Sequence, residues 1–152
     1  MKLAEALAER ADLQTRFGQL AARAKQSARH QEGETPPEDA AALLVEMDRV
    51  AARLEDLVVR INVQNLATEV SPGVSMTAAL ARRDTLRRLQ KSRAELADAA
   101  ATQVDRYSRT ELRSFAALDV KALREEADAF AKEARELDTL IQGVNWMTEM
   151  AG

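Results

Sequence analysis

The chain contains no cysteine among its 152 residues. Disulfide bonds, a thiolate nucleophile and a zinc site with cysteine ligands are therefore excluded. Aromatic side chains are also scarce, at 3% of the residues, although 46% of the residues are hydrophobic. Ala and Leu supply most of the apolar side chains, and 31% of the residues are charged. This mixture is typical of long helices and coiled coils.

Long apolar runs and an excess of one charge are missing as well. No segment approaches the roughly 18 uninterrupted apolar residues of a membrane-spanning helix. The N-terminal turn, residues 1–6, mixes acidic and basic side chains, unlike a signal peptide. The net charge is −3 and the two signs are interspersed, which does not favour nucleic-acid binding. We therefore expect a cytoplasmic protein that binds neither nucleic acid nor membrane.

Apolar residues recur at alternating spacings near three and four, a pattern that predicts long amphipathic helices. The first helix is expected from about Lys2 to His30. The second follows residues 35–38, Thr-Pro-Pro-Glu, which have the spacing of a capping box with proline at the first helical position. It is expected to end near Thr68, before the turn-forming Ser-Pro-Gly of residues 71–73.

A third helix is expected to start near Thr77, a plausible N-cap residue, with a less regular seam that includes Arg82 and Arg93. A fourth begins at Asp119. Its apolar seam is unbroken and comprises Val120, Leu123, Ala127, Phe130, Ala134, Leu137, Ile141 and Val144.

The predicted fold class is all-α, with residues 1–152 forming a single helical domain. Short connections make neighbouring helices antiparallel, so we expect either a bundle or elongated helical hairpins. Residues 105–118 do not read as a continuous helix, yet a structureless loop of this size is uncommon. A short strand around residues 112–118 that pairs with residues 69–76 is one arrangement that would order both segments.

Basic residues cluster along the third predicted helix. Arg83, Arg87 and Lys91 share one stripe, which suits either a phosphate or acidic ligand or ion pairs with acids of the second helix: Glu46, Glu55 and Asp56. Arg82 and Arg93 lie in the seam, where a guanidinium needs a carboxylate. Because Asp84 follows Arg83 too closely to share its face, we expect the partners on another helix.

Three further groups are candidate binding residues. Arg106, Tyr107 and Arg109 cluster in a predicted loop, where binding residues are often found, although they could also tie the loop to helix ends. Asn62 and Asn65 near the end of the second helix suit a small polar pocket or a buried registry contact. With Arg82 and Arg83, these residues form the candidate ligand site.

The end of the chain is unusually apolar. Trp146 lies two residues beyond the seam residue Val144, so it should point away from the seam, and Met147 and Met150 accompany it. Aromatic and methionine side chains are enriched in protein interfaces. We expect these three residues to contact another subunit or to cover the chain's own loops.

Metal and cofactor sites are not predicted. The only histidine, His30, lies where the first helix is expected to end, a position that favours a solvated helix-end residue. Di-iron sites in helical bundles need Glu-x-x-His pairs on facing helices, and the sequence has none. We expect no metal and no cofactor, and no catalytic motif is present.

Several segments together resemble a family of small bacterial helical proteins labelled septicolysin. They are residues 1–14, Ile61 and Asn62 with Asn65 and Thr68, and residues 79–86, 95–100, 105–109 and 136–146, of which Asp-Arg-Tyr-Ser-Arg at 105–109 is the most specific. The resemblance implies an all-helical fold and a homo-oligomer, without an established activity. The label implies a pore-forming cytolysin, but the chain shows neither a strongly apolar segment nor a cationic helix face.

We therefore expect a homo-oligomeric interaction or structural protein. The alternative is a small-molecule or anion-binding protein, or an enzyme, with its site at Arg82, Arg83 and the 105–109 loop. A membrane-active cytolysin is the third hypothesis.

Overall fold

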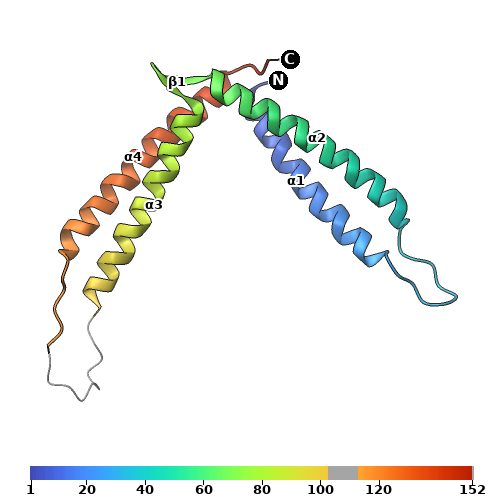
Figure 1. Cartoon of the computed structure of the whole chain (residues 1–152), viewed down its shortest axis with the longest axis horizontal. Coiled ribbons are helices and arrows are strands. Elements are labelled where there is room, and N and C mark those ends of the chain that lie inside the picture. The colour runs from blue at the N-terminus through green and yellow to red at the C-terminus, as the bar shows by residue number, and fades with distance from the viewer. Residues whose placement is uncertain (103–112, 152) are drawn as a thin grey trace. The chain divides into compact units, whose positions relative to one another are not determined.

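Four helices and one small strand pair make up the part of the chain that the structure, a computed structural model, describes: residues 1–102 and 113–151. The all-α fold class is therefore confirmed. The elements are α1 (Leu3–Gln26), α2 (Ala40–Ala67), β1 (Glu69–Ser71), β2 (Val74–Ser75), α3 (Met76–Ala101) and α4 (Val120–Met147) (Figure 1). They group into two compact units, residues 1–69 with 143–152 and residues 70–142.

The first unit is built on a hairpin of α1 and α2, which lie side by side in Figure 1. The two helices bury one stripe each along a shared seam. Leu20, Leu43 and Val50 form a buried cluster, against which Leu13, Ala24 and Met47 pack. Leu57 and Ile61 extend the buried stripe of α2, with 0% and 1% of their surfaces exposed. The heptad spacing of these apolar residues explains why each helix buries a single narrow stripe.

The loop between α1 and α2 is longer than the sequence suggested. Helix α1 ends at Gln26 rather than near His30, and Ser27 donates its backbone N–H to the Arg23 carbonyl oxygen. Helix α2 begins at Ala40 and not at Pro36, so the predicted capping box at residues 35–38 is wrong. The actual cap is Asp39, whose carboxylate accepts hydrogen bonds from the backbone N–H groups of residues 41 and 42.

A physical reason for the later start lies in the proline pair. The residue before a proline disfavours the α conformation, which discourages a helical turn at residues 35 and 36. Glu38 is also engaged elsewhere, since its backbone N–H donates to the Ser27 hydroxyl and its carboxylate accepts from Arg23. The predicted partner of Thr35 is therefore not available for a capping box.

The expected strand at residues 69–76 is present, but its partner is local. Strands β1 and β2 pair with each other, joined by a turn in which Gly73 has a φ of +75°, a conformation that favours glycine. Residues 113–118 contain no strand, so the predicted pairing with them is wrong. A two-residue turn satisfies the strand hydrogen bonds within one short segment.

The second unit contains α3 and most of α4, again side by side (Figure 1). Helix α3 is capped by Ser75, whose hydroxyl accepts from the Ala78 N–H, and not by Thr77. Its buried residues are Met76, Ala79, Leu86 and Ala97. This spacing places Arg83, rather than Arg82, in the seam together with Arg93.

Helix α4 agrees closely with the sequence-based prediction. Asp119 caps it by accepting a hydrogen bond from the Ala122 N–H at 3.0 Å. Every residue of the predicted seam from Val120 to Val144 is buried or half-buried. None of the helices within residues 1–102 and 113–151 is long and apolar enough to cross a membrane.

Candidate functional site

Arg82 and Arg83 of α3, which were predicted to bind a ligand, form ion pairs with carboxylates of the same unit. Arg82 donates from Nε and Nη2 to Glu133 Oε1 at 3.1 and 2.7 Å. Arg83, with 19% of its side chain exposed, donates from Nη1 to Asp138 Oδ1 at 3.0 Å. Both acids belong to α4, as the requirement for a partner on another helix predicts. Arg83 also reaches Asp84 at 3.2 Å, which the sequence argument had wrongly excluded.

Arg87 and Arg93 of α3 also pair with acids of α4, whereas Lys91 pairs with Glu95 of α3 itself at 3.7 Å. Arg87 shares Asp138 at 3.4 Å, and Arg93 donates to Glu126 at 2.6 Å while its guanidinium lies 6.0 Å from the Phe130 ring centroid. Two of the three acids expected from α2 are paired within the first unit instead: Glu46 with Arg16, and Asp56 with Arg53 and Arg60. Arg83 and Arg87 of the stripe, together with Arg82 and Arg93, therefore join α3 to α4 through opposite charge.

The other predicted ligand residues do not belong to the described part of the second unit. Asn62 is exposed and Asn65 is half-buried, and both lie on α2 in the first unit, whereas Arg82 and Arg83 lie in the second. Arg106, Tyr107 and Arg109 lie outside the described residues. A site that combines the five remaining positions is a prediction that the described geometry does not test.

The predicted contact residues at the chain end differ in exposure. Trp146 and Met147 are 62% and 80% exposed, whereas Met150 is buried, with 9% of its surface exposed. Met150 donates its backbone N–H to the Met1 carbonyl oxygen at 2.9 Å, and Leu3 donates to the Thr148 carbonyl oxygen at 2.9 Å. The two chain ends are therefore held together by backbone hydrogen bonds.

Charged side chains reinforce this junction. Glu149 accepts from Lys2 Nζ at 2.7 Å and from the N-terminal amine at 3.4 Å. These bonds hold the pKa of the Glu149 carboxyl below its ordinary value, with Lys2 making the larger contribution. On the other side of the tail, Gln64 accepts from the Ala151 N–H at 3.1 Å and Arg60 donates to the Ala151 carbonyl oxygen at 3.2 Å.

A ladder of ion pairs sets the register of the α1–α2 hairpin. Its three steps join Glu9 to Arg53, Arg16 to Glu46 and Arg23 to Glu38. On α1 the ladder residues are seven apart, so they all lie on the same side of the seam. The bidentate hydrogen bond from Arg23 lowers the pKa of Glu38, and Glu38 raises the pKa of Arg23.

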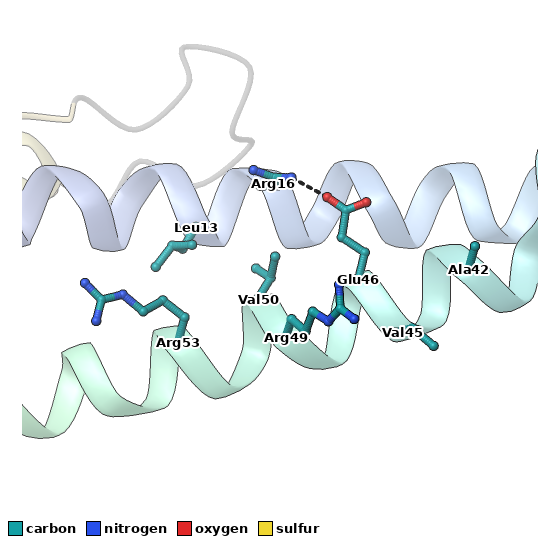
Figure 2. A pocket seen from close by; sticks show the side chains of 8 residues that line it. All are labelled: Leu13, Arg16, Ala42, Val45, Glu46, Arg49, Val50 and Arg53. Atoms are coloured by element: carbon teal, nitrogen blue, oxygen red, sulfur yellow. Dashed lines mark hydrogen bonds and ion pairs between the residues drawn. The ribbon is translucent and has the colours of Figure 1, made fainter.

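A groove of about 600 Å³ runs along this side of the hairpin. Figure 2 shows Leu13 and Val50 between the two helices, with Arg16 reaching Glu46 above them and Arg49 and Arg53 following along α2. The groove is therefore an apolar floor bordered by charged side chains. Ala42 and Val45 complete its lining.

The charges of the groove are largely balanced. Arg16 is paired with Glu46, and Arg53 is paired with Glu9 at 2.8 Å and Asp56 at 3.3 Å. Arg49 also lines the groove, is exposed, and has no carboxylate partner among residues 1–102 and 113–151. A single unpaired, exposed arginine gives weak attraction for an anion in water, so the ladder is better explained as a register device than as a ligand site.

Metal chemistry finds no support in the described residues. No group of three or more His, Asp or Glu side chains within residues 1–102 and 113–151 could hold a metal ion. His30 is exposed, and its Nδ1 lies 3.0 Å from the Gln31 carbonyl oxygen. The imidazole is thus engaged locally, in the loop that follows α1.

The family to which the chain belongs is shown by a family model that matches residues 10–150. The chain belongs to a family of unknown function (DUF6847). It is also similar to a crystal structure of a functionally unknown conserved protein from Corynebacterium diphtheriae. The two are 41% identical over 99% of each chain, with a TM-score of 0.93. No curated protein matches the chain, and neither similarity supports the septicolysin label.

The ladder of the α1–α2 hairpin was not among the features predicted from the sequence. Residues 9, 16 and 23 are charged, are spaced by seven and lie beside the apolar seam of α1. Residues 53 and 46 repeat this spacing on α2 with complementary charge. This pattern, read as the flanking positions of paired heptads, would have predicted both the antiparallel register and the groove.

Proposed function

We propose that this member of the DUF6847 family is a homo-oligomeric helical interaction protein that uses Trp146 and Met147 as a self-contact. The observation that supports this proposal is the exposure of both side chains, 62% and 80%, on the last turn of α4. An exposed tryptophan with an adjacent exposed methionine is typical of interface cores and is uncommon on a surface without a partner.

The backbone beneath the two side chains is held in place, which favours binding. Backbone hydrogen bonds join Leu3 to Thr148 and Met150 to Met1, and Lys2 donates from Nζ to the Met147 carbonyl oxygen. A contact surface that is ordered before association loses less conformational entropy on binding. Met150 supports this arrangement from within its own chain, because it is buried there.

An anion-binding function is less well supported. A ligand at Arg82 or Arg83 would have to displace a carboxylate of α4 that is already hydrogen-bonded at 2.7–3.0 Å. Such a displacement exchanges one charged acceptor for another and gains little free energy. The 105–109 loop remains the part of that hypothesis to be tested separately.

Sedimentation velocity of the wild type at tens of micromolar tests the proposal. We expect an oligomer, and we expect Trp146→Ala to weaken it by on the order of 2 kcal/mol, or about 30-fold in dissociation constant. Phe115→Ala is the matched control, because Phe115 is an aromatic residue with 81% exposure in residues 113–118. A monomeric wild type would refute the proposal, and equal effects of both variants would refute the role of Trp146.

A further inference from the structure

The two flanks of the α1–α2 hairpin differ sharply in charge. The ion-pair ladder occupies one flank. The opposite flank, here called the uncharged flank, is formed on α1 by Ala4, Leu7, Ala11, Gln14, Gly18 and Ala21, and on α2 by Leu44, Ala51, Val58 and Asn65. A charged residue, Lys25, continues the α1 row only in the last turn of the helix. These positions follow the same heptads as the seam, on the side away from the ladder. Among the large apolar side chains of this flank, Leu44 is 55% exposed, and Leu7 and Val58 are half-buried.

Gly18 is an unexplained residue within this flank. It lies in the interior of α1, where glycine costs about 1 kcal/mol relative to alanine. A Cβ built at this position would meet nothing within 4 Å, so no neighbour among residues 1–102 and 113–151 requires a glycine there. Close approach of a helix from outside the chain would give this glycine a structural purpose.

The ladder also defines which residues of the two helices lie at the same height. Glu9 lies level with Arg53, and Arg16 lies level with Glu46. A step of seven residues forward along α1 therefore matches a step of seven residues back along α2. By this rule Gly18 is level with Leu44. Further along the hairpin, Ala11 is level with Ala51, and Ala4 is level with Val58.

We infer that a second copy of this chain packs on the uncharged flank, related by a two-fold axis that runs along the hairpin. Each α1 then lies antiparallel on the α2 of the other copy, and levels are preserved. This places the partner subunit's Leu44 opposite Gly18, a large side chain against a residue without one. Helices α1 and α2 of the two copies together form a four-helix bundle of two hairpins, a common arrangement for helices with apolar stripes on two sides.

The size of the flank suits a dimer contact. Helix α1 has 24 residues, which at about 1.5 Å per residue gives a length of about 36 Å. Two helices about 10 Å apart make a surface about 20 Å wide, or roughly 700 Å² per copy. Stable interfaces bury about 800 Å² per partner, so the flank alone approaches the required area.

The charge distribution points to the same occupant. Interface cores are depleted of charged residues, and here the acidic Asp48 and Glu55 border the flank on α2 rather than occupying its centre. One chain provides both a row of small residues on α1 (Ala4, Ala11 and Gly18) and, at the same levels on α2, a row that is larger at two of its three positions (Val58, Ala51 and Leu44). A second copy therefore supplies each row with its complement, which is the requirement of a two-fold interface.

This inference rests on the proposed homo-oligomer and adds a contact separate from Trp146. The test uses full-length Leu44→Glu and Gly18→Leu, with Val45→Glu as the control. Val45 is the next residue along α2, is 51% exposed and lines the charged groove instead. Sedimentation velocity gives the assembly, and far-UV circular dichroism verifies that each variant keeps the wild-type helix content.

We expect Leu44→Glu and Gly18→Leu each to raise the dissociation constant of the contact at least tenfold, and Val45→Glu to change it less than threefold. A Cβ at residue 18 meets nothing within 4 Å, and the circular dichroism spectrum of Gly18→Leu shows whether its helices are unchanged. An oligomer unaffected by the first two variants, or weakened equally by all three, overturns this inference but leaves the proposed function standing. A monomeric wild type overturns both.

Cross-linking tests the two-fold arrangement itself, since the chain has no native cysteine. Ala11→Cys and Ala51→Cys proteins are prepared separately and then mixed under oxidising conditions. The proposed pairing predicts disulfide-linked dimers in the mixture and none in either protein alone, because Ala11 faces the partner subunit's Ala51. Efficient cross-linking of Ala11→Cys alone would place α1 against α1 and overturn the pairing.

Discussion

Replacing Leu57 by alanine tests whether the seam of the α1–α2 hairpin, rather than its ion pairs, stabilises the first unit. Leu57 is completely buried, with 0% of its surface exposed. Deleting a buried leucine side chain costs about 3 kcal/mol, from lost transfer free energy and the cavity left behind. The ladder pairs are partly exposed, and such pairs contribute between about 0 and 1 kcal/mol each. The seam should therefore dominate.

Leu66 provides a control on the same helix, because 68% of its surface is exposed. We expect Leu66→Ala to change the free energy of unfolding by less than about 0.5 kcal/mol. For a chain of this size, about 3 kcal/mol corresponds to a fall in melting temperature of roughly 6–12 °C.

Thermal unfolding followed at 222 nm, with urea titration as a second measurement, gives both values. Measurements at several protein concentrations separate the effect on the hairpin from any effect on assembly. A loss below 1 kcal/mol for Leu57→Ala, or equal losses for the two variants, would refute the argument that this seam is the core of the unit.

Two further predictions concern charge. Arg83→Ala should destabilise the α3–α4 hairpin by about 1–2 kcal/mol, because it removes a half-buried ion-pair partner from Asp138. Arg82→Ala removes a more exposed ion pair and should cost less than about 1 kcal/mol. Urea titrations in which Arg82→Ala costs more than Arg83→Ala would contradict the seam position of Arg83. Arg23 lowers the pKa of Glu38 in the folded state. The pair therefore stabilises the folded protein fully at pH values above the unfolded-state pKa of glutamate, and this contribution is lost as the pH falls through the folded-state pKa. Glu38→Gln should remove this acid dependence, and an unchanged stability profile between pH 6 and pH 3 would show that the pair does not contribute.

The helices could be predicted from the sequence because their seams repeat the heptad without long interruptions. Helix α4 was predicted to within a residue at its start, where an aspartate precedes the first seam residue. Helix ends were less predictable where two signals compete. At the start of α2, both Thr35 and Asp39 precede a helical pattern, and only the proline pair and the hydrogen bonds of Glu38 decide between them.

The placement of the arginines was predictable in part. The need of a seam guanidinium for a carboxylate on another helix follows from the cost of leaving it unpaired, and α4 supplies those carboxylates. Which arginine lies in the seam was not predictable, because Arg82 and Arg83 differ by only 100° around the helix. The irregular seam of α3 allowed both phases.

By itself, the sequence determined four amphipathic helices, their apolar stripes and the absence of cysteine chemistry, since these depend on residue type and local spacing alone. The tertiary structure decided which helices pair and that Trp146 and Met147 remain exposed while Met150 is buried. It also decided that four arginines of α3 meet acids of α4 rather than of α2. Those outcomes depend on contacts between residues far apart in the chain. A heptad pattern indicates that a helix packs against another helix, but register, charge and chain connection together determine which helix that is.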